Sequence, residues 1–570
     1  MGLTSSLQLG RSGLLASQTA IETTGNNLAN LATPGYKVQR VELSAVGDRR
    51  VATNQYLGQG VQIDAITRQV DEAVEARLRS SIADQAAAGA TADQVSRIEA
   101  VQNELTGRDL TTRLGEYFNA WSQLTTNPQD PSLRTLVTSE ATSLASFIND
   151  LRSGYSDIRA ESTTALEEAV NSAESLLERI ESVNGAINVQ EGGGVGESSA
   201  LRDQRDQLLA ELAQFLDVSV VEQNNGSVDV FVGSLPVILN GQSRGLELRE
   251  RTVNGEVITE VVIADDGSAL DVSSGELGAR IEFINNDLGT AVDDLDAITG
   301  RLIYETNRVH SQGQGTSLIR SVAATNAVTD PTAVLSDLEL TELPLAASNG
   351  SFEISVVSQA TGQATTTVID VDLDGINPAT DTTLSDLTAA LDAVAGVSAS
   401  VSSTGQLVIA SDSANSRLSF SNDTSGVLAA LGINSLFTGS TAFDIGVNQA
   451  VMSDPTLLAA GQERLAGDNR NALALAALRD EPLTELNGLS VTRAWSRQVE
   501  EVGTRLAQAR DDREAALVVR ENLEQRQAAI SGVNADEETI NLLAYQRAYQ
   551  ASARFINVVD ELTQTLLNLV

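Results

Sequence analysis

The sequence of 570 residues contains no cysteine, one histidine and one lysine, and these absences exclude several kinds of chemistry. Without cysteine there are no disulfides, thiolate nucleophiles or cysteine-ligated metals. A lone His310 excludes an HExxH site and leaves little basis for a Ser-His-Asp triad, so we expect it to fill space or to bond near a helix end. The only lysine, Lys37, follows Tyr36, so the Gly-Lys pair of a phosphate-binding loop is missing.

Aromatic residues are also scarce, at 3% of the chain, whereas hydrophobic residues reach 42%. Hydrophobic cores built mainly from aliphatic residues suit helix bundles and thin β-domains better than deep ligand pockets, which favour aromatic linings. Acidic residues number 77, and although a glycosidase-like carboxylate pair could exist among them, no pair stands out. We therefore expect no enzyme, no catalytic residue, no cofactor and no metal site.

The formal net charge of −40 and the pI of about 4.2 have consequences for binding partners. Duplex nucleic acid and anionic membranes repel such a surface, so we predict neither as a partner. No apolar run approaches the ~18 residues that a membrane span needs. We also expect no cleavable secretory leader.

The first and last segments of the sequence carry apolar or small residues at alternating steps of four and three. This spacing predicts a coiled-coil-like helix in each segment, with one narrow stripe to bury. Small residues weaken both stripes, so we predict that these helices are marginally ordered in the monomer and become rigid on assembly. The stripe positions are Leu3, Leu7, Gly10, Leu14, Ser17, Ile21, Thr24, Leu28 and Leu31, and Leu542, Tyr545, Tyr549, Ser552, Ile556, Val559, Thr563, Leu566 and Val570.

The pattern between these segments predicts a multidomain α+β chain with a nested, elongated arrangement. Its parts are terminal axial-core helices with an extended segment (1–70 and 531–570), a helical-bundle domain (71–217, 274–312 and 447–530), a first β-rich domain (218–273) and a second α/β outer insert (313–446). Asn225-Gly226 and Asn254-Gly255 predict hairpin turns in the first β-rich domain. Asn534 is the predicted N-cap of the last helix.

Two ends of the sequence resemble the bacterial flagellar axial proteins of rod, hook and hook-associated type. Residues 17–43 read SQTAIETTGNNLANLATPGYKVQRVEL and match the N-terminal signature of that superfamily. Residues 531–568, together with DNRNALALAAL at 468–478, resemble the branch of first hook–filament junction proteins. One departure is visible: where the family has Ser-Arg after Pro-Gly-Tyr, this chain has Lys37-Val38, which puts a basic role at position 38 in doubt.

The resemblance implies a structural protein that is secreted without cleavage through the flagellar type III export channel. Its implied partners are the hook protein, the second hook–filament junction protein, copies of itself in a ring, and a flagellar export chaperone at the C-terminal end. Its implied place is the extracellular hook–filament junction. Together with the stripes, it predicts an N-terminal assembly interface of Leu7, Leu14, Ile21, Leu28, Asn27, Asn30, Pro34, Gly35 and Tyr36, and a C-terminal one of Leu542, Tyr545, Tyr549, Ile556, Val559 and Leu566.

Several alternatives stay open. The chain could be another axial protein, such as a hook or distal-rod subunit, or an adhesin or enzyme displayed on a flagellar scaffold with its activity in residues 313–446. Asn26, Asn27 and Asn30 can pin the loop before Pro34 or contact a neighbouring subunit.

An acidic run in the outer insert imitates the start of an EF-hand loop. Asp370, Asp372, Asp374 and Gly375 match its opening, and Asp381 stands at its twelfth position. A strand pattern precedes the run and Pro378 stands at the ninth position, so we interpret it as a strand followed by an acidic turn, with calcium binding as the alternative.

Overall fold

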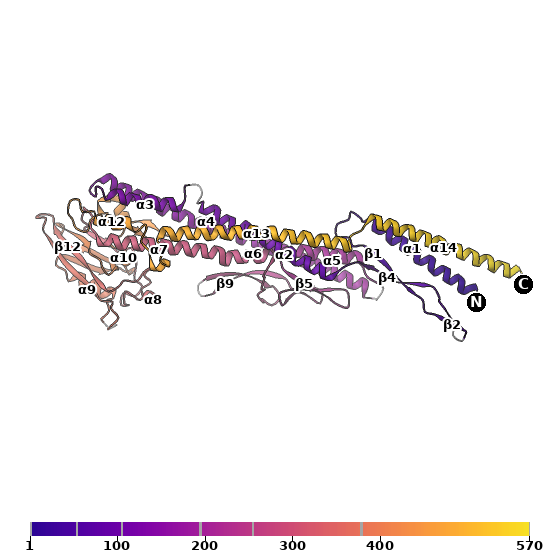
Figure 1. Cartoon of the computed structure of the whole chain (residues 1–570). Helices are drawn as coiled ribbons and strands as arrows, with labels where there is room; N and C mark the ends of the chain where they lie inside the picture. Colours follow the sequence, from indigo (N-terminus) through magenta and orange to yellow (C-terminus); the bar gives the residue numbers. More distant parts are fainter. Residues whose placement is uncertain are drawn as a thin grey trace. The chain divides into compact units, whose positions relative to one another are not determined.

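The computed structural model describes residues 3–52, 55–103, 107–192, 196–253, 256–376 and 380–568 (Figure 1). Unit 1 comprises Met1–Gln94, Ser162–Asn285 and Leu506–Val570; unit 2 comprises Val95–Glu161 and Asn286–Arg505. The mixed α+β class with terminal helices and β-rich middle regions is confirmed. The predicted domain limits and the nested, elongated arrangement stay predictions, since the two units divide the chain inside its long helices.

The helices of unit 1 include both predicted terminal ones, α1 and α14. Asn534 begins α14 as predicted, because its Oδ1 accepts the Asp536 amide proton at 3.0 Å. The first helix ends at Ala29, two residues before the last stripe position, Leu31. The helices lying wholly or partly in unit 1 are α1 (Leu3–Ala29), α2 (Glu72–Gln102), α4 (Pro131–Glu191), α5 (Ser199–Leu212), α6 (Gly275–Glu282), which runs into a π-turn at Phe283–Asp287, α13 (Val491–Ser531) and α14 (Ala535–Asn568).

Two β regions complete unit 1. The predicted extended segment forms antiparallel β1 (Gln39–Ala45) and β4 (Val61–Arg68), with β2 (Arg49–Ala52) and β3 (Gln55–Leu57) between them. The first β-rich region forms β5 (Val218–Glu222), β6 (Val228–Val232), β7 (Leu235–Leu239) and β8 (Gln242–Ser243) in one sheet, and a hairpin of β9 (Leu246–Val253) and β10 (Glu256–Ile263).

The predicted hairpin turns of that region have different outcomes. Asn225-Gly226 lies in the connection of β5 and β6, where Gly226 adopts a φ of 82°, a conformation that favours glycine. The predicted Asn254-Gly255 turn lies outside the described residues, as do Pro378 and the stripe position Val570.

Unit 2 packs helices around the largest buried side chains of the chain. Trp121 and Tyr117 of α3 are fully buried, and the Tyr117 ring lies 5.6 Å from that of Phe437. Its helices are α3 (Leu110–Leu124), α7 (Leu288–Gln312), α8 (Leu338–Thr341), α9 (Leu384–Asp392), α10 (Val427–Leu431), α11 (Gln449–Ser453) and α12 (Arg470–Ala477), with short 3-10 turns at Pro455–Leu457 and Thr484–Leu486.

The described residues of the outer insert form two three-stranded sheets. A third, short pairing joins the two-residue strands β17 (Phe437–Thr438) and β18 (Gly446–Val447). One sheet orders β13 (Ala364–Val371), β12 (Gly350–Ser358) and β16 (Ser416–Ser421); the other orders β11 (Ser321–Ala323), β15 (Leu407–Ser411) and β14 (Val397–Val401). Alternation along β12 buries Phe352 and Ile354 completely. The core between these elements is made of large aliphatic and aromatic residues.

Candidate assembly interface

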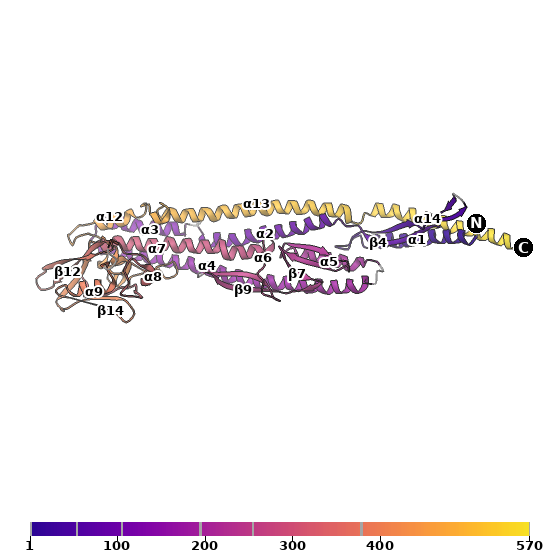
Figure 2. The ribbon, with the colours of Figure 1, turned by 90° about the horizontal axis from the view of Figure 1, so that it is seen from below.

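The two terminal helices of unit 1 lie side by side and run antiparallel (Figures 1 and 2). Gly10 of α1 lies against Ile556 and Phe555 of α14, and Gly13 lies against Ser552. At the other end of the pair, the Asn27 side chain donates to Glu538 at 2.8 Å. The two stripes predicted from the sequence therefore do meet, in one chain, as an antiparallel pair.

The contact on α1 consists mainly of small side chains. A Cβ on Gly10 would lie only 2.7 Å from Ile556 Cγ1, so a larger residue there would force the helices apart. Small residues bury little apolar area, so this contact alone stabilises the pair weakly. The buried residues of α1 are Gly10, Ala16, Ser17, Ala20, Thr23, Thr24 and Asn27.

The large predicted stripe residues lie at the margins of this contact. Leu7, Leu14, Ile21 and Leu28 are half-buried, as are Leu542, Tyr545 and Ile556, whereas Val559 is buried and Tyr549 remains 37% exposed. Leu566 lies in α14, but its side chain is outside the described residues. The sequence interpretation missed Ala16, Ala20 and Thr23, although their spacing of four and three residues was available as a signal.

A second apolar surface runs along the side of α14 that faces away from Ile556 and Ser552. At 100° per residue its members fall within an arc of about 120°. Exposed apolar side chains that gather on one side of a helix mark interaction sites, and here Arg547 and Arg554 lie among them. This outer apolar stripe consists of Ile540, Leu543, Val558 and Leu562, each between 50% and 66% exposed, and Phe555, which contacts Gly10, borders it.

Asn27 connects three parts of the chain through its side-chain amide. Its Nδ2 donates to Glu538 Oε2 at 2.8 Å and to the Gln39 carbonyl at 2.9 Å. Its Oδ1 accepts from the Tyr36 hydroxyl at 2.8 Å and from the Gln39 amide at 3.1 Å. Asn27 therefore uses its full hydrogen-bonding capacity inside one chain, which supports the pinning interpretation of the asparagine signature.

The other signature residues surround this centre. Asn26 donates to the Tyr36 hydroxyl at 3.2 Å, and Asn30 donates to the Asn26 carbonyl at 3.0 Å. Burial, together with the nearby Asp203 and Glu538 carboxylates, raises the pKa of Tyr36 to about 12, so this phenol keeps its proton. Asn30 is half-buried, while Pro34 and Gly35 are exposed, which leaves them accessible to a neighbouring subunit.

The chain that follows α1 is anchored by buried charges. Lys37 forms an ion pair with Glu75 of α2, and both side chains are buried. Gln527 of α13 donates to both oxygens of Glu75, at 2.9 and 2.8 Å. The only lysine of the sequence therefore links the extended segment to two long helices, a role that its position in the motif alone did not predict.

Two further contacts secure the same segment. Val38 is buried and its amide donates to the Ser531 carbonyl at 2.8 Å, so no basic side chain acts at position 38. Arg68 Nη1 donates to Asp203 and Asp206, each at 2.8 Å. Burial raises the pKa of Asp203, and the Arg68 guanidinium opposes that rise. Residues 203–209, which read DQRDQLL, thus include two structural partners of the extended segment.

His310 in unit 2 is a structural residue. It lies near the end of α7, where its Nε2 accepts the Ala459 amide proton at 3.0 Å and its Nδ1 lies 2.7 Å from the Asn434 carbonyl. Burial lowers its pKa to about 4, so the ring is neutral and donates from Nδ1. The expected helix-end hydrogen bond is confirmed.

No described helix has both the length and the apolar composition needed to cross a bilayer. Three family models match the chain in order. "Flagella basal body rod protein" matches residues 7–37, "Flagellar hook-associated protein FlgK helical domain" matches 95–318, and "Flagellar basal body rod FlgEFG protein C-terminal" matches 525–569. The first and last of these contain most of the antiparallel helix pair.

Comparison with whole proteins gives a consistent result. Flagellar hook-associated protein 1 of Escherichia coli (strain K12) is 24% identical and that of Salmonella typhimurium 23% identical, each over 98% of both chains. The Bacillus subtilis protein of the same name is 26% identical over 49% of this chain and 57% of its own length. A solved structure of the flagellar hook junction protein FlgK from Burkholderia pseudomallei aligns with a TM-score of 0.49 and 17% identity, covering 80% of this chain and 100% of that chain. Over its full length the chain is therefore similar to flagellar hook-associated protein 1, and residues 95–318 match the model of that protein's helical domain.

Proposed function

We propose that the chain is a structural component of the bacterial flagellum that joins the hook to the filament. The observation that carries this proposal is the full-length sequence similarity to flagellar hook-associated protein 1. The exposed apolar residues of the terminal helix pair support it. In one chain the pair buries small residues and leaves large ones half-exposed. Copies and relatives packed around it would cover those surfaces.

In this proposal the predicted interface residues make the contacts between subunits. The half-buried Leu7, Leu14, Ile21 and Leu28 would complete their burial against neighbouring helices, as would Leu542, Tyr545, Tyr549, Ile556, Val559 and Leu566. Asn27 and Tyr36 would hold the loop that presents Asn30, Pro34 and Gly35 to a neighbour. The outer apolar stripe of α14 gives a second surface, so that each helix pair can contact neighbours on two sides.

The proposed partners follow from the same place in the flagellum. The hook protein lies on one side, the second hook–filament junction protein on the other, and copies of the chain form a ring. The chain reaches this extracellular position through the flagellar type III system without cleavage, and an export chaperone covers the C-terminal helix beforehand. Residues 1–70 and 531–570 serve as the axial core, the three helical segments as the next layer, and residues 218–273 and 313–446 as outward β-rich parts.

The decisive experiment deletes the gene and measures motility, flagellar morphology and secreted flagellin together. We expect hook-bearing cells without filaments that do not swim and that release flagellin into the medium. Restoration by the full-length gene is the control. A deletion strain that still assembles filaments on its hooks would refute the junction assignment, and one that lacks hooks would favour a rod or hook subunit instead.

The alternative function, that of an adhesin or enzyme, would lie in the outer insert. Removal of residues 313–446 should leave a chain that still joins hook to filament if the insert serves only contacts and surface charge. Glycan binding or hydrolysis by the intact chain that disappears with this deletion would instead establish an adhesin or enzyme. The helical-domain match at residues 95–318 favours the junction protein, because it extends well beyond the rod-type ends.

A further inference from the structure

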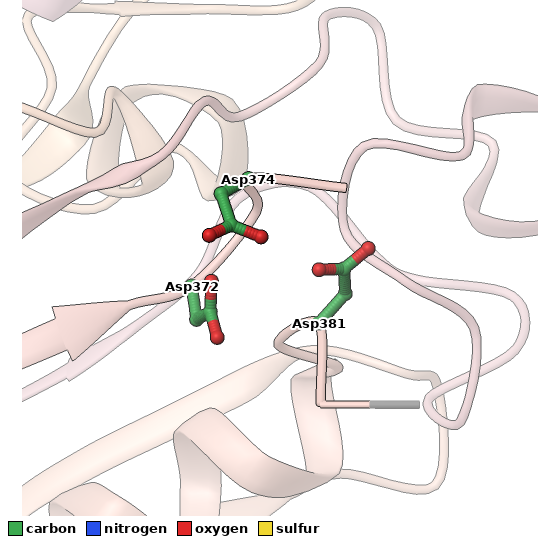
Figure 3. Close-up of side chains that lie close together, drawn as sticks. All are labelled: Asp372, Asp374 and Asp381. Atoms are coloured by element: carbon green, nitrogen blue, oxygen red, sulfur yellow. The ribbon is translucent and has the colours of Figure 1, made fainter. Parts of the chain in front are cut away.

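Three carboxylates converge where β13 ends in the outer insert. The side chains of Asp372, Asp374 and Asp381 offer oxygen atoms that all lie within 4.8 Å of one another. Figure 3 shows them turned toward a common space. They come from a strand end and from the stretch before α9, so the fold, and not only the sequence spacing, brings them together.

The base of this cluster is held by the backbone. The Thr382 amide donates to the Asp372 carbonyl at 2.7 Å, and the Asp372 amide donates to Thr382 Oγ1 at 2.9 Å. Thr383 and Asp386 then form a capping box that starts α9. Asp374 is oriented by the Ile376 amide, which donates to its Oδ1 at 2.8 Å. The cluster is therefore built on fixed elements.

Asp381 gives the independent sign of a missing partner. It is the most enclosed of the three, and its Oδ1 atom exposes less than 1 Å² and has no hydrogen-bond partner. Among the described residues, no ion pair includes Asp372, Asp374 or Asp381. An enclosed carboxylate oxygen without a partner destabilises a fold unless a cation or a donor satisfies it. Lysine and arginine do not fill this role here.

The donor set selects the kind of cation. Carboxylate oxygens without nitrogen or sulfur suit hard divalent ions. Calcium accepts the irregular coordination that carboxylates from a strand end and a turn can offer, whereas magnesium demands a near-ideal octahedron. We therefore take calcium as the ion.

We propose that Asp372, Asp374 and Asp381 bind one calcium ion that ties the end of β13 to the start of α9. The site is not an EF-hand: β13 precedes it in place of a helix, and Asp370, at the first EF-hand position, lies within the strand outside the cluster. Calcium joins the two ends of the acidic turn and neutralises the mutual repulsion of three carboxylates. The predicted strand before the acidic turn is confirmed as β13. The turn itself is the proposed calcium site.

Calorimetric titration of the full chain tests the site directly. After chelation and dialysis, calcium chloride should give one binding event per chain with a Kd on the order of 10⁻⁴–10⁻³ M, as in extracellular calcium modules. Magnesium chloride should bind at least tenfold more weakly. Asp374→Asn and Asp381→Asn should each weaken calcium binding at least tenfold, while Asp370→Asn, within β13 and outside the cluster, should leave it unchanged. Absence of calcium heat, or equal loss in the Asp370 variant, overturns the proposal.

Thermal unfolding distinguishes a ligand from a merely structural carboxylate. In chelator, Asp381→Asn should raise the unfolding midpoint of the insert, because an uncompensated buried charge is removed. In millimolar calcium the order should reverse, since the variant loses the ion. A variant that is less stable than the parent by the same amount in both solutions would show that Asp381 acts without calcium. Asp374→Asn, at an exposed position, gives the same test with little risk to folding.

Discussion

The terminal helix pair and the core of the outer insert bury their residues in opposite ways. In the insert, Phe352, Ile354 and Leu384 are completely buried. In the helix pair, most buried positions are small or polar, Val559 is a buried exception, and the large residues Leu14 and Ile556 are only half-buried. The insert has the packing of a self-sufficient fold, whereas in our proposal the helix pair completes its burial only against neighbours. This difference separates variants that should impair folding from variants that should impair assembly.

The largest expected effect is loss of assembly from one charge in the helix pair. Leu14→Asp or Ile556→Asp should give non-swimming, filament-less cells that release flagellin, because each places a carboxylate in a surface that assembly would bury. Motility and secretion assays measure this. Gly25→Ala on α1 is the control: nothing lies within 4 Å of its added Cβ, and alanine favours helix by up to about 1 kcal/mol. Normal swimming of both Asp variants would contradict the interface.

Hydrogen exchange should sharpen the same contrast in the monomer. We expect amides of residues 3–35 and 540–568 to exchange orders of magnitude faster than those of β12, because weakly packed helices open locally at small free energy. Mass spectrometry on a chain shown to be monomeric by sedimentation measures this. Equal, strong protection in the two regions would mean that the helix pair is stable without neighbours.

The insert should respond to loss of packing. Phe352→Ala should destabilise the unfolding transition of the insert by about 3–5 kcal/mol, since it leaves a cavity in a closed core. Denaturant unfolding followed by circular dichroism measures the change. Val368→Ala, at a position 56% exposed on the neighbouring strand, should change stability by less than about 0.5 kcal/mol. A small effect of the Phe352 substitution would show that the insert is not the tightly packed region.

A smaller effect is expected at Asn27, which connects α1 to the extended segment and to α14. Asn27→Ala removes four hydrogen bonds and leaves buried partners unsatisfied, so we expect a loss of about 2–4 kcal/mol from the unfolding free energy. Asn26→Ala, which removes an exposed contact with Tyr36, should lose less than about 1 kcal/mol. Unfolding of the two purified variants in parallel tests this, and equal losses would argue against Asn27 as the centre.

The smallest effect within a single pH unit concerns His310. Burial lowers its pKa from 6.5 to about 4, so the unfolded chain binds a proton that the folded chain excludes. Its stabilising contribution is full above pH 6.5 and is lost as the pH falls toward 4, by up to about 1.4 kcal/mol per pH unit. His310→Gln should lack this slope, so the difference in stability between parent and variant should shrink on acidification. A constant difference would contradict the assigned protonation.

The sequence predicted elements better than their contacts. Residue spacing and turn residues were sufficient for the terminal helices and for the hairpin at Asn225-Gly226, because each depends on local sequence. Residue spacing alone predicted that the leucines of α1 lie at the centre of its contact with α14. In the structure the two helices approach closely, and small residues of α1 occupy that centre. The bond from Asn27 to Glu538 spans 511 positions, and no local pattern encodes such a pairing. Likewise, the two units divide inside α2, α4 and α13, where helical periodicity is continuous.

The burial of Lys37 against Glu75 makes the chain a ready-made reporter of its own opening. Because this is the sole lysine, an amine-reactive reagent can modify only one side chain, and that side chain is shielded while the extended segment stays docked on α2 and α13. The rate of acylation at this position therefore measures how often that docking releases. The measurement needs no engineered label and can be followed before and after subunits join.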